Sequence, residues 1–270
     1  MLVGLGWRKP IASWIASFPE EIQCLEITAE HFFDRDERVL SDLRQRVPLF
    51  VHGLGLSLGT PGPIDPDTLC QFKRVARMAN AKWVSEHVAF TRTGDVDLGH
   101  LNPILPTRAT LRVLVDHVKQ LADECGCPVL LENITSEVRL DGEIREVEFL
   151  HEVCDRADCS LLLDVTNLFI NSKNHNFDPI DWFAELPASR IRQLHVVGYG
   201  LYQGFYQDVH TGCIQADLWS LIDDVINSSP ELQAVTIEWD HTFPDTAVLT
   251  NELRLLQSRK IPRHDAMPAE

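Results

Sequence analysis

The 270-residue sequence has no apolar run close to the ~18–20 residues that a membrane-spanning helix needs. Its first residues also lack the basic flank and long apolar stretch of a secretory signal peptide, so a cytoplasmic protein is expected. Positive charge is scarce, because 24 Lys and Arg stand against 40 Asp and Glu, a formal charge of −16. Nucleic acids and anionic membranes are bound through Lys and Arg, so the sequence argues against both. The excess of carboxylates instead favours cationic ligands, above all metal ions.

Several catalytic motifs have no support in the sequence. The glycines of the stretch VHGLGLSLG (51–59) are not followed by the lysine of a phosphate-binding loop, so nucleotide binding is rejected. Neither Ser-His-Asp nor Cys-His catalysis has specific support. The seven cysteines are an odd number, which indicates reduced thiols rather than disulfides. Cys125 and Cys127 are too close together for a zinc knuckle, and we expect half-buried residues near a helix end.

Short apolar segments alternate with amphipathic ones along the chain, which favours a (β/α)8 TIM barrel over an open doubly wound sheet. A 3.6-residue spacing predicts helices that include 65–79, 109–125, 146–156 and 216–226. No linker or repeat divides residues 1–257, which are expected to form one TIM-barrel domain, whereas 258–270 are expected to be a disordered tail. The eight expected strands are residues 2–6, 23–27, 48–52, 82–87, 128–132, 160–164, 192–197 and 234–239.

Side chains that bind metals end six of the expected strands. In an α/β barrel the C-terminal strand ends meet at one mouth, where the active site lies. A single His or acid at a strand end is more often a loop-facing or capping residue, but six coincidences are much less plausible. Several carboxylates at one mouth also repel each other unless a cation offsets the charge. The strand-end residues are His52, His87, Glu132, Asp164, His195, and Glu238 with Asp240.

Further candidates follow the strands. Asn167 lies three residues after Asp164. Asp208 and His210 follow the seventh strand with an i, i+2 spacing that puts both side chains on one side of an extended segment. The ten N and O ligands exceed what one octahedral ion needs, so two or three metals are expected, and the ligand type suits iron, manganese or zinc. The full ligand set is His52, His87, Glu132, Asp164, Asn167, His195, Asp208, His210, Glu238 and Asp240.

Three more residues are candidates to orient these ligands. Glu26 lies near the end of the second strand. Glu30 and His175 lie in short polar runs, for which a solvated loop is the alternative interpretation.

These motifs, in this order, resemble the multinuclear non-haem iron-dependent oxidase (MNIO) family, the former UPF0276 family of unknown function. Its members include oxidases of methanobactin and 3-thiaglutamate biosynthesis. VHGLGLSLG (51–59) and IEWD (237–240) are the specific stretches. The others become informative as an ordered set that runs to about residue 257: GLGWR (4–8), EITAE (26–30), SEH (85–87), LEN (131–133), LDVTN (163–167), LHVVG (194–198) and DVH (208–210).

The resemblance implies a TIM barrel that holds two or three iron ions in a mixed Fe(II)/Fe(III) state and uses O2 as co-substrate. The ten candidate ligands match the family's metal-binding positions. Family members modify cysteine in ribosomally made precursor peptides, and a separate protein that binds the leader peptide is implied as a heterodimer partner. In the implied mechanism the cysteine thiolate binds one iron, O2 binds a neighbouring ferrous ion, and hydrogen is removed from the cysteine β-carbon.

Two segments depart from the family pattern. Residues 196–199 (Val-Val-Gly-Tyr) replace an alanine-glycine-histidine version, and 168–173 form a different loop after Asn167. Both are expected to line the substrate mouth. VHGLGLSLG separates the chain from the methanobactin branch and favours cysteine β-carbon excision of the 3-thiaglutamate type or the chemistry of another cysteine-modifying branch. Arg8 is a candidate contact for a peptide carboxylate, with an exposed or structural arginine as the alternative, and Asn133 is a further candidate beside the ligands.

Three other functions compete with the oxidase. A three-zinc phosphodiester hydrolase of the endonuclease IV type would use clustered metals to activate water, but the charge of −16 argues against a DNA-binding surface. A divalent-metal sugar isomerase would need fewer ligands and typically a lysine near the metals. A metal-binding module without catalysis is the last alternative, and ten ligands at one mouth argue against it.

Overall fold

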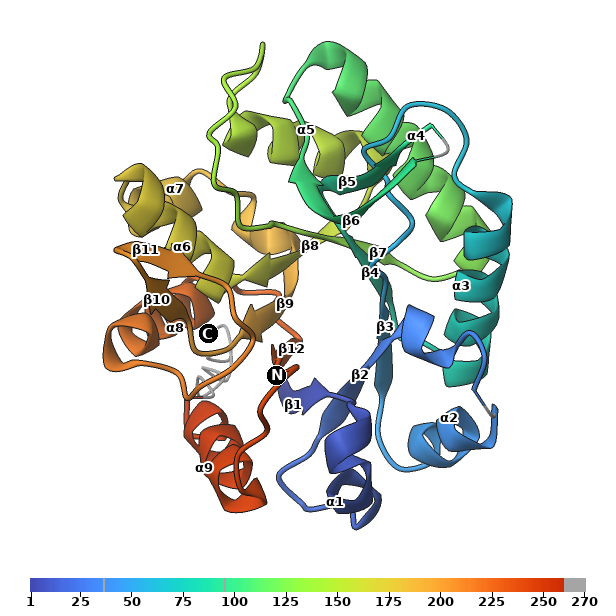
Figure 1. The fold of residues 1–270 in the computed structure, drawn as a ribbon, viewed down its shortest axis with the longest axis vertical. Helices are drawn as coiled ribbons and strands as arrows, with labels where there is room; N and C mark the ends of the chain where they lie inside the picture. Colours follow the sequence, from blue (N-terminus) through green and yellow to red (C-terminus); the bar gives the residue numbers. More distant parts are fainter. Residues whose placement is uncertain (36, 95, 260–270) are drawn as a thin grey trace, which may run out of the picture.

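Eight parallel strands close into a barrel in the computed structural model, which describes residues 1–35, 37–94 and 96–259 (Figure 1). Spatial neighbours follow chain order, and the last strand pairs with the first from Leu2–Ala234 to Leu5–Ile237. The predicted (β/α)8 barrel is confirmed, and the open sheet is wrong. The barrel strands are β1 (Leu2–Gly6), β2 (Cys24–Thr28), β3 (Leu49–His52), β4 (Val84–His87), β7 (Val129–Glu132), β8 (Ser160–Asp164), β9 (Ile191–Val196) and β12 (Ala234–Ile237).

Helices surround the barrel as an outer ring (Figure 1). Helix α3 begins with an Asp65 cap and a proline, and α4 ends at Gly126 in the left-handed conformation with a φ of 68°. No helix within the described ranges is long and apolar enough to cross a membrane. The helices are α1 (Ala12–Ala16), α2 (Glu37–Arg44), α3 (Pro66–Ala79), α4 (Arg108–Cys125), α5 (Glu146–Ala157), α6 (Val165–His175), α7 (Pro179–Ala184), α8 (Ala216–Ser228) and α9 (Thr246–Gln257), with 3-10 turns at Lys9–Ile11, Ala29–Phe32 and Ala188–Arg190.

Two β-hairpins that the sequence did not predict stand at the mouth. The first consists of β5 (Ala89–Thr93) and β6 (Val96–Pro103) and follows β4; the second consists of β10 (Gly200–Tyr202) and β11 (Phe205–Gln207) and follows β9. Gln203 and Gly204 make the second turn with φ values of 50° and 86°, as a tight hairpin requires. Because each hairpin follows the C-terminal end of a barrel strand, both belong to the face where active sites form.

The loop expected at 168–173 is wrong, because these residues lie inside α6. This helix starts directly after β8, where the Asp164 side chain accepts a hydrogen bond from the Asn167 backbone N–H. Leu168 and Ile170 are buried, and Phe169 stacks on Tyr199 at 5.0 Å between ring centroids. The apolar residues that looked like a mouth loop are therefore the packing face of a helix.

The barrel interior is built in layers that follow the two-residue period of the strands. The lower layer is an apolar cluster in which Phe50 and Trp83 stack at 4.0 Å. Two residues further along the same strands, the inward positions change to polar groups. The cluster Cys24, Phe50, Trp83, Leu130, Leu162 and Ala234 is followed in this way by Glu26, His52, Ser85, Glu132, Asp164 and Thr236, all of them buried.

The end of the described chain stays attached to the barrel. Ser258 donates to the Leu255 carbonyl, and Arg259 pairs with Asp223 and lies over the Trp219 ring at 4.0 Å. The rest of the expected disordered tail, residues 260–270, lies outside the described residues.

Candidate metal centre

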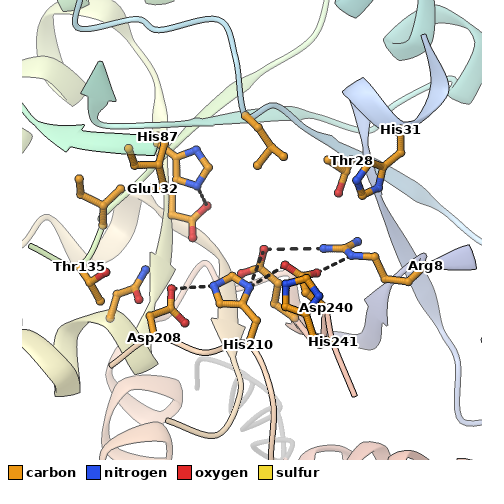
Figure 2. Close-up of a pocket in the computed structure, with 15 residues that line it drawn as sticks. Arg8, Thr28, His31, His87, Glu132, Thr135, Asp208, His210, Asp240 and His241 are labelled. Carbon is orange, nitrogen blue, oxygen red and sulfur yellow. Dashed lines mark hydrogen bonds and ion pairs between the residues drawn. The ribbon is translucent and has the colours of Figure 1, made fainter. Parts of the chain in front are cut away.

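A first donor group joins β3, β4 and β7. His52 Nε2 lies 3.4 Å from Glu132 Oε2, and His87 Nε2 lies 3.6 Å from the same oxygen. Figure 2 shows His87 pointing at Glu132 from the wall of the pocket. The two imidazoles and one carboxylate oxygen form a set that can hold a cation.

A second donor group takes one residue from each of four elements. It consists of Glu132, Asp164, His195 and Glu238, whose ligand atoms all lie within 4.8 Å of one another. His195 Nδ1 lies 3.2 Å from Glu132 Oε1 and 3.1 Å from Glu238 Oε2. Glu132 therefore presents one oxygen to each of the first two groups.

A third donor group consists of His210, Glu238 and Asp240. His210 Nδ1 lies 2.9 Å from Asp240 Oδ2 and 3.7 Å from Glu238 Oε1, so Glu238 is shared in the same way as Glu132. The sequence predicts an extended segment from Asp208 to His210. This prediction is wrong at His210, whose φ is 47°. The three groups form a continuous chain linked by two shared carboxylates.

The two histidines of the first group are each held at their outer nitrogen. Nδ1 of His52 lies 2.9 Å from Ser85 Oγ, and Nδ1 of His87 lies 3.0 Å from Glu86 Oε1. Such partners fix the ring orientation and leave Nε2 for a metal. Neither Ser85 nor Glu86 was predicted as a histidine partner from the sequence, although both stand beside His87 in the SEH motif (85–87).

The two remaining histidines are held by carboxylates. His195 Nε2 lies 2.8 Å from Glu26 Oε1, so Glu26 orients a candidate ligand as expected. His210 Nε2 donates to Asp208 Oδ2 at 2.7 Å. Asp208, a candidate ligand by sequence, therefore lies on the outer side of His210 and outside the three donor groups.

Asn167 and Asn133 hold the end of β8. The Asn133 side chain bonds both the N–H and the carbonyl of Asp164 at 2.9 Å, and Asn167 Nδ2 donates to the Asn133 carbonyl at 3.1 Å. Asn133 therefore fixes the Asp164 backbone, while Asn167 lines the pocket and is oriented by the same contact.

Arg8 lies inside the centre rather than on the surface. Its guanidinium binds Asp240 through Nε and lies 3.9 Å from Glu238 Oε1, and it also donates to the Trp7 carbonyl (Figure 2). These contacts position the third donor group and offset its negative charge. The alternative of a structural arginine therefore takes a specific form, in which Arg8 holds Asp240 and Glu238 in place.

Glu30 and His175 do not join any of the donor groups. Glu30 Oε1 accepts from the Leu54 and Gly55 N–H groups at 2.9 Å, and burial and then the Glu86 carboxylate raise the pKa of Glu30 to about 7. His175 Nε2 donates to the Ser136 carbonyl at 2.7 Å and lines a different cavity. Both residues shape backbone around the mouth instead of touching a candidate ligand.

Ser57 stands at the centre of GLSLG (55–59), which has the G-x-S-x-G spacing of a nucleophile elbow, so an interpretation of the sequence as free of this motif is wrong. It is buried, and its Oγ accepts from the Thr91 and Arg92 N–H groups and bonds Thr60. Ser57 therefore anchors β5 through its hydroxyl group. All seven cysteines are thiols without a disulfide, none is in a donor group, and Cys125 and Cys127 are half-buried beside the end of α4 as expected.

Unpaired buried atoms show that the centre fits cations. Among the described residues, buried polar side-chain atoms without a hydrogen bond include five from the candidate ligand set. Each such atom costs ~1–3 kcal/mol when it stays unpaired. The atoms of His52, Glu132 and Glu238 lie in the donor groups, where a bound cation would satisfy them, and the N and O donors without sulfur suit a borderline or hard ion. The five atoms are His52 Nε2, Glu132 Oε2, Asn167 Oδ1, Asp208 Oδ1 and Glu238 Oε2.

Two histidines of the metal-free centre, His87 and His210, bind protons strongly. Burial opposes a charged His87, but the Glu132 and Glu86 carboxylates more than offset this and raise its pKa to about 9. Burial is outweighed in the same way at His210. The Glu238 carboxylate and hydrogen bonds to Asp208 and Asp240 raise the pKa of His210 to about 12. These imidazoles must lose a proton before they can bind a metal.

Metal affinity is therefore expected to rise with pH. Between pH 6.5 and 8, both histidines are protonated in the metal-free protein, so each displaced proton tightens apparent binding about tenfold per pH unit. Titration of metal-free protein with Mn(II), in calorimetry buffers of different ionisation heat, measures the protons released. An affinity that does not change over this range, with no proton release, would contradict the proposed donor set.

A cavity of about 390 Å³ opens above the three groups, within the size range of small-molecule and cofactor sites. His87, Glu132, His210 and Asp240 line its base (Figure 2). Fold and site together define the class: a (β/α)8 barrel with three groups of His, Glu and Asp at its mouth that could each hold a metal ion. Residues 2–260 match the family model described as RiPP precursor modification enzyme MbnB/TglH/ChrH. The chain belongs to this family of enzymes that modify ribosomally synthesised precursor peptides.

Individual relatives agree with the family. A UPF0276 protein of Rhizorhabdus wittichii is 32% identical over 259 residues, which cover 94% of this chain and 93% of that protein. The barrel is similar to 3-keto-D-glucoside 4-epimerase, YcjR, from E. coli (TM-score 0.64, 14% identity, 96% of this chain and 99% of that one). It is also similar to endonuclease IV from Thermus thermophilus (TM-score 0.60, 14% identity, 96% and 98%). At these identities the two structures show the fold alone.

Proposed function

We propose that the chain is a multinuclear iron-dependent oxidase that uses O2 to modify a cysteine in a precursor peptide. The observation that carries this proposal is the chain of three donor groups joined by Glu132 and Glu238, each of which offers one oxygen to either side. A single-ion enzyme has no need for shared carboxylates. Family membership supports the peptide substrate.

The donor set supports two or three ions. His52, His87 and Glu132 would hold one ion; the group around His195 would hold a second, and His210 with Asp240 a third. Imidazole and carboxylate ligands suit iron. Iron bound there would supply O2 activation and a binding position for the substrate thiolate.

The protein's own residues prepare the site in three ways. Ser85, Glu86 and Glu26 hold the imidazoles in fixed orientations, which keeps the ligands in place. Below the centre, the stacked Phe50 and Trp83 close the barrel to water. Polar rim residues, including Thr28 and Thr135 (Figure 2), stand where the backbone of a bound peptide can be hydrogen-bonded.

The proposed outcome is excision of the cysteine β-carbon, as in 3-thiaglutamate formation. The stretch VHGLGLSLG (51–59), which favours this branch, contributes directly to the site. His52 is a candidate ligand, and Leu54, fixed by the Glu30 carboxylate, lines the cavity. A separate leader-peptide-binding protein, forming a heterodimer in the cytoplasm, belongs to the same proposal.

Metal analysis of protein purified without added metal tests the proposal. We expect at least two iron ions per chain, together with turnover of a cysteine-containing precursor peptide that requires O2 and partial reduction. Mass spectrometry detects both the metals and the peptide product. Stoichiometric zinc without iron would contradict the oxidase and would favour a hydrolytic barrel instead.

A further inference from the structure

A second cavity of about 530 Å³ lies beside the metal centre, between the 133–145 connection, α5 and the α6–α7 region. It shares Ile134 with the metal-site cavity, so one segment of backbone separates the two spaces. Thr135 lines the metal side and Ser136 the other side. We call this second cavity the side groove.

The dividing segment is fixed by one face of α6. Asn167, Asn171 and His175 are spaced four residues apart, so they lie in a row along the helix. Each donates to a backbone carbonyl of 133–136, which holds the wall between the cavities in place. The bonds run to the carbonyls of Asn133 (3.1 Å), Ile134 (2.8 Å) and Ser136 (2.7 Å).

The side groove combines an apolar floor with an acidic rim. Phe149 and Leu150 are buried beneath it, and Phe177 and Trp182 are half-buried along it. The charged residues that line it are six acids and two arginines, and Arg145 is already paired with Glu185. The acids are Asp141, Glu143, Glu146, Asp178, Asp181 and Glu185; the arginines are Arg139 and Arg145.

We propose that the side groove binds a segment of the precursor peptide a few residues from the modified residue. It would accept an apolar or aromatic side chain against Phe177 and Trp182, with a neighbouring Lys or Arg at the acidic rim. This inference rests on the proposed function only in taking the substrate to be a peptide. An extended chain advances ~3.3–3.6 Å per residue, so a side chain two to four residues from the modified residue lies about 7–14 Å away from it along the peptide.

Three observations favour this occupant. The groove adjoins the candidate active site across Ile134, so one extended peptide that passes over the dividing segment can reach both cavities. Its fixed wall provides a preformed binding surface, which lowers the entropic cost of binding. Its acidic rim complements basic peptide side chains and disfavours acidic ones.

A rival surface is the β10–β11 hairpin. Leu201, Tyr202 and Phe205 are between 61% and 64% exposed at its tip, and the hairpin is anchored to α6 because Asn174 bonds both backbone groups of Tyr206. Its tip offers exposed apolar side chains, whereas the side groove combines an apolar floor with acidic residues, so we assign the peptide segment to the side groove and use the hairpin as an outcome of the test.

Photo-crosslinking locates the segment without any need for turnover. The probes are synthetic peptides with a central cysteine, p-benzoylphenylalanine two to four residues to either side, and two lysines beyond it. With the metal-loaded protein we expect crosslinks to residues 138–150 or 177–182, located by peptide mass spectrometry. Crosslinks confined to 200–207, or no specific crosslink with any probe, would overturn the proposal.

Charge reversal tests the rim. The double variant Asp141→Lys/Asp181→Lys is expected to weaken anisotropy-measured binding of a fluorescein-labelled probe by about tenfold. The matched control Asp116→Lys/Asp224→Lys changes the net charge equally at exposed positions on α4 and α8, and should change binding less than twofold. Equal losses in both would contradict the groove. This experiment measures peptide binding and needs no turnover. If the enzyme is inactive or contains no iron but the two double variants still differ in binding, the proposed oxidase is refuted and the proposed groove is retained.

Discussion

Replacing Glu132 with glutamine is expected to remove about two metal ions per chain and to reduce turnover at least ~100-fold. One Glu132 oxygen faces His52 and His87, and the other faces His195, so the substitution weakens two donor groups at once. Metal content by mass spectrometry and turnover of a precursor peptide measure the two effects. Glu238→Gln, which changes the other shared carboxylate, should behave in the same way.

Two comparators make this prediction specific. His52→Ala and Asp240→Ala each remove a ligand from one group only, so each should lose about one ion and most activity while the barrel still folds. Glu148→Gln, an exposed position on α5, is the matched control and should keep full metal content. Equal metal loss from Glu132→Gln and Asp240→Ala would show that the carboxylates are not shared, and unchanged metal in all variants would show that the ligand set is wrong.

Replacing Gly4 with alanine is expected to destabilise the barrel by at least about 3 kcal/mol. Gly4 is in β1, paired with β12 and β2, and a Cβ there would lie 2.0 Å from the Cys24 carbonyl oxygen and 2.7 Å from its sulfur. The contact is with backbone, so no side-chain rotation can relieve it. Soluble yield and the urea midpoint of unfolding measure the loss.

Gly55→Ala is the control for this prediction. A Cβ at Gly55 would meet only Glu30 Oε1, at 3.4 Å, which is ordinary contact. Its unfolding midpoint should stay close to that of the unchanged protein. If Gly4→Ala were as stable as Gly55→Ala, β1 would not be packed against β2 as closely as the structure shows.

The sequence predicted the barrel well because its eight strands carry apolar runs, six of which end in metal-binding side chains. The apolar-to-polar change at Phe50 and His52, or at Leu130 and Glu132, is a local pattern readable without the fold. Eight of the ten candidate ligands meet in the three donor groups for this reason. The strand bounds differ by at most two residues at each end.

The remaining features depend on contacts that a linear pattern does not contain. The β5–β6 and β10–β11 hairpins have exposed, irregular patterns, so their strands resemble loops. Ser85 becomes recognisable as the partner of His52 only when β3 and β4 lie side by side, whereas Glu86 contacts its own sequence neighbour, His87. The 168–173 segment corresponds to a loop in the family pattern, which is why a loop was predicted. Its buried side chains instead pack as one face of a helix.

The shared carboxylates also have a mechanical consequence. The donor groups draw on six barrel strands or the segments after them, from β3 to β12, so ions bound there would act as cross-links between distant parts of one chain. A cross-link that closes a long loop slows unfolding more than local contacts do, because the loop must open before the chain can disperse. Bound ions would thus hold the closed barrel together. The rate of proteolysis in native buffer would then report how fully metal ions occupy the donor groups.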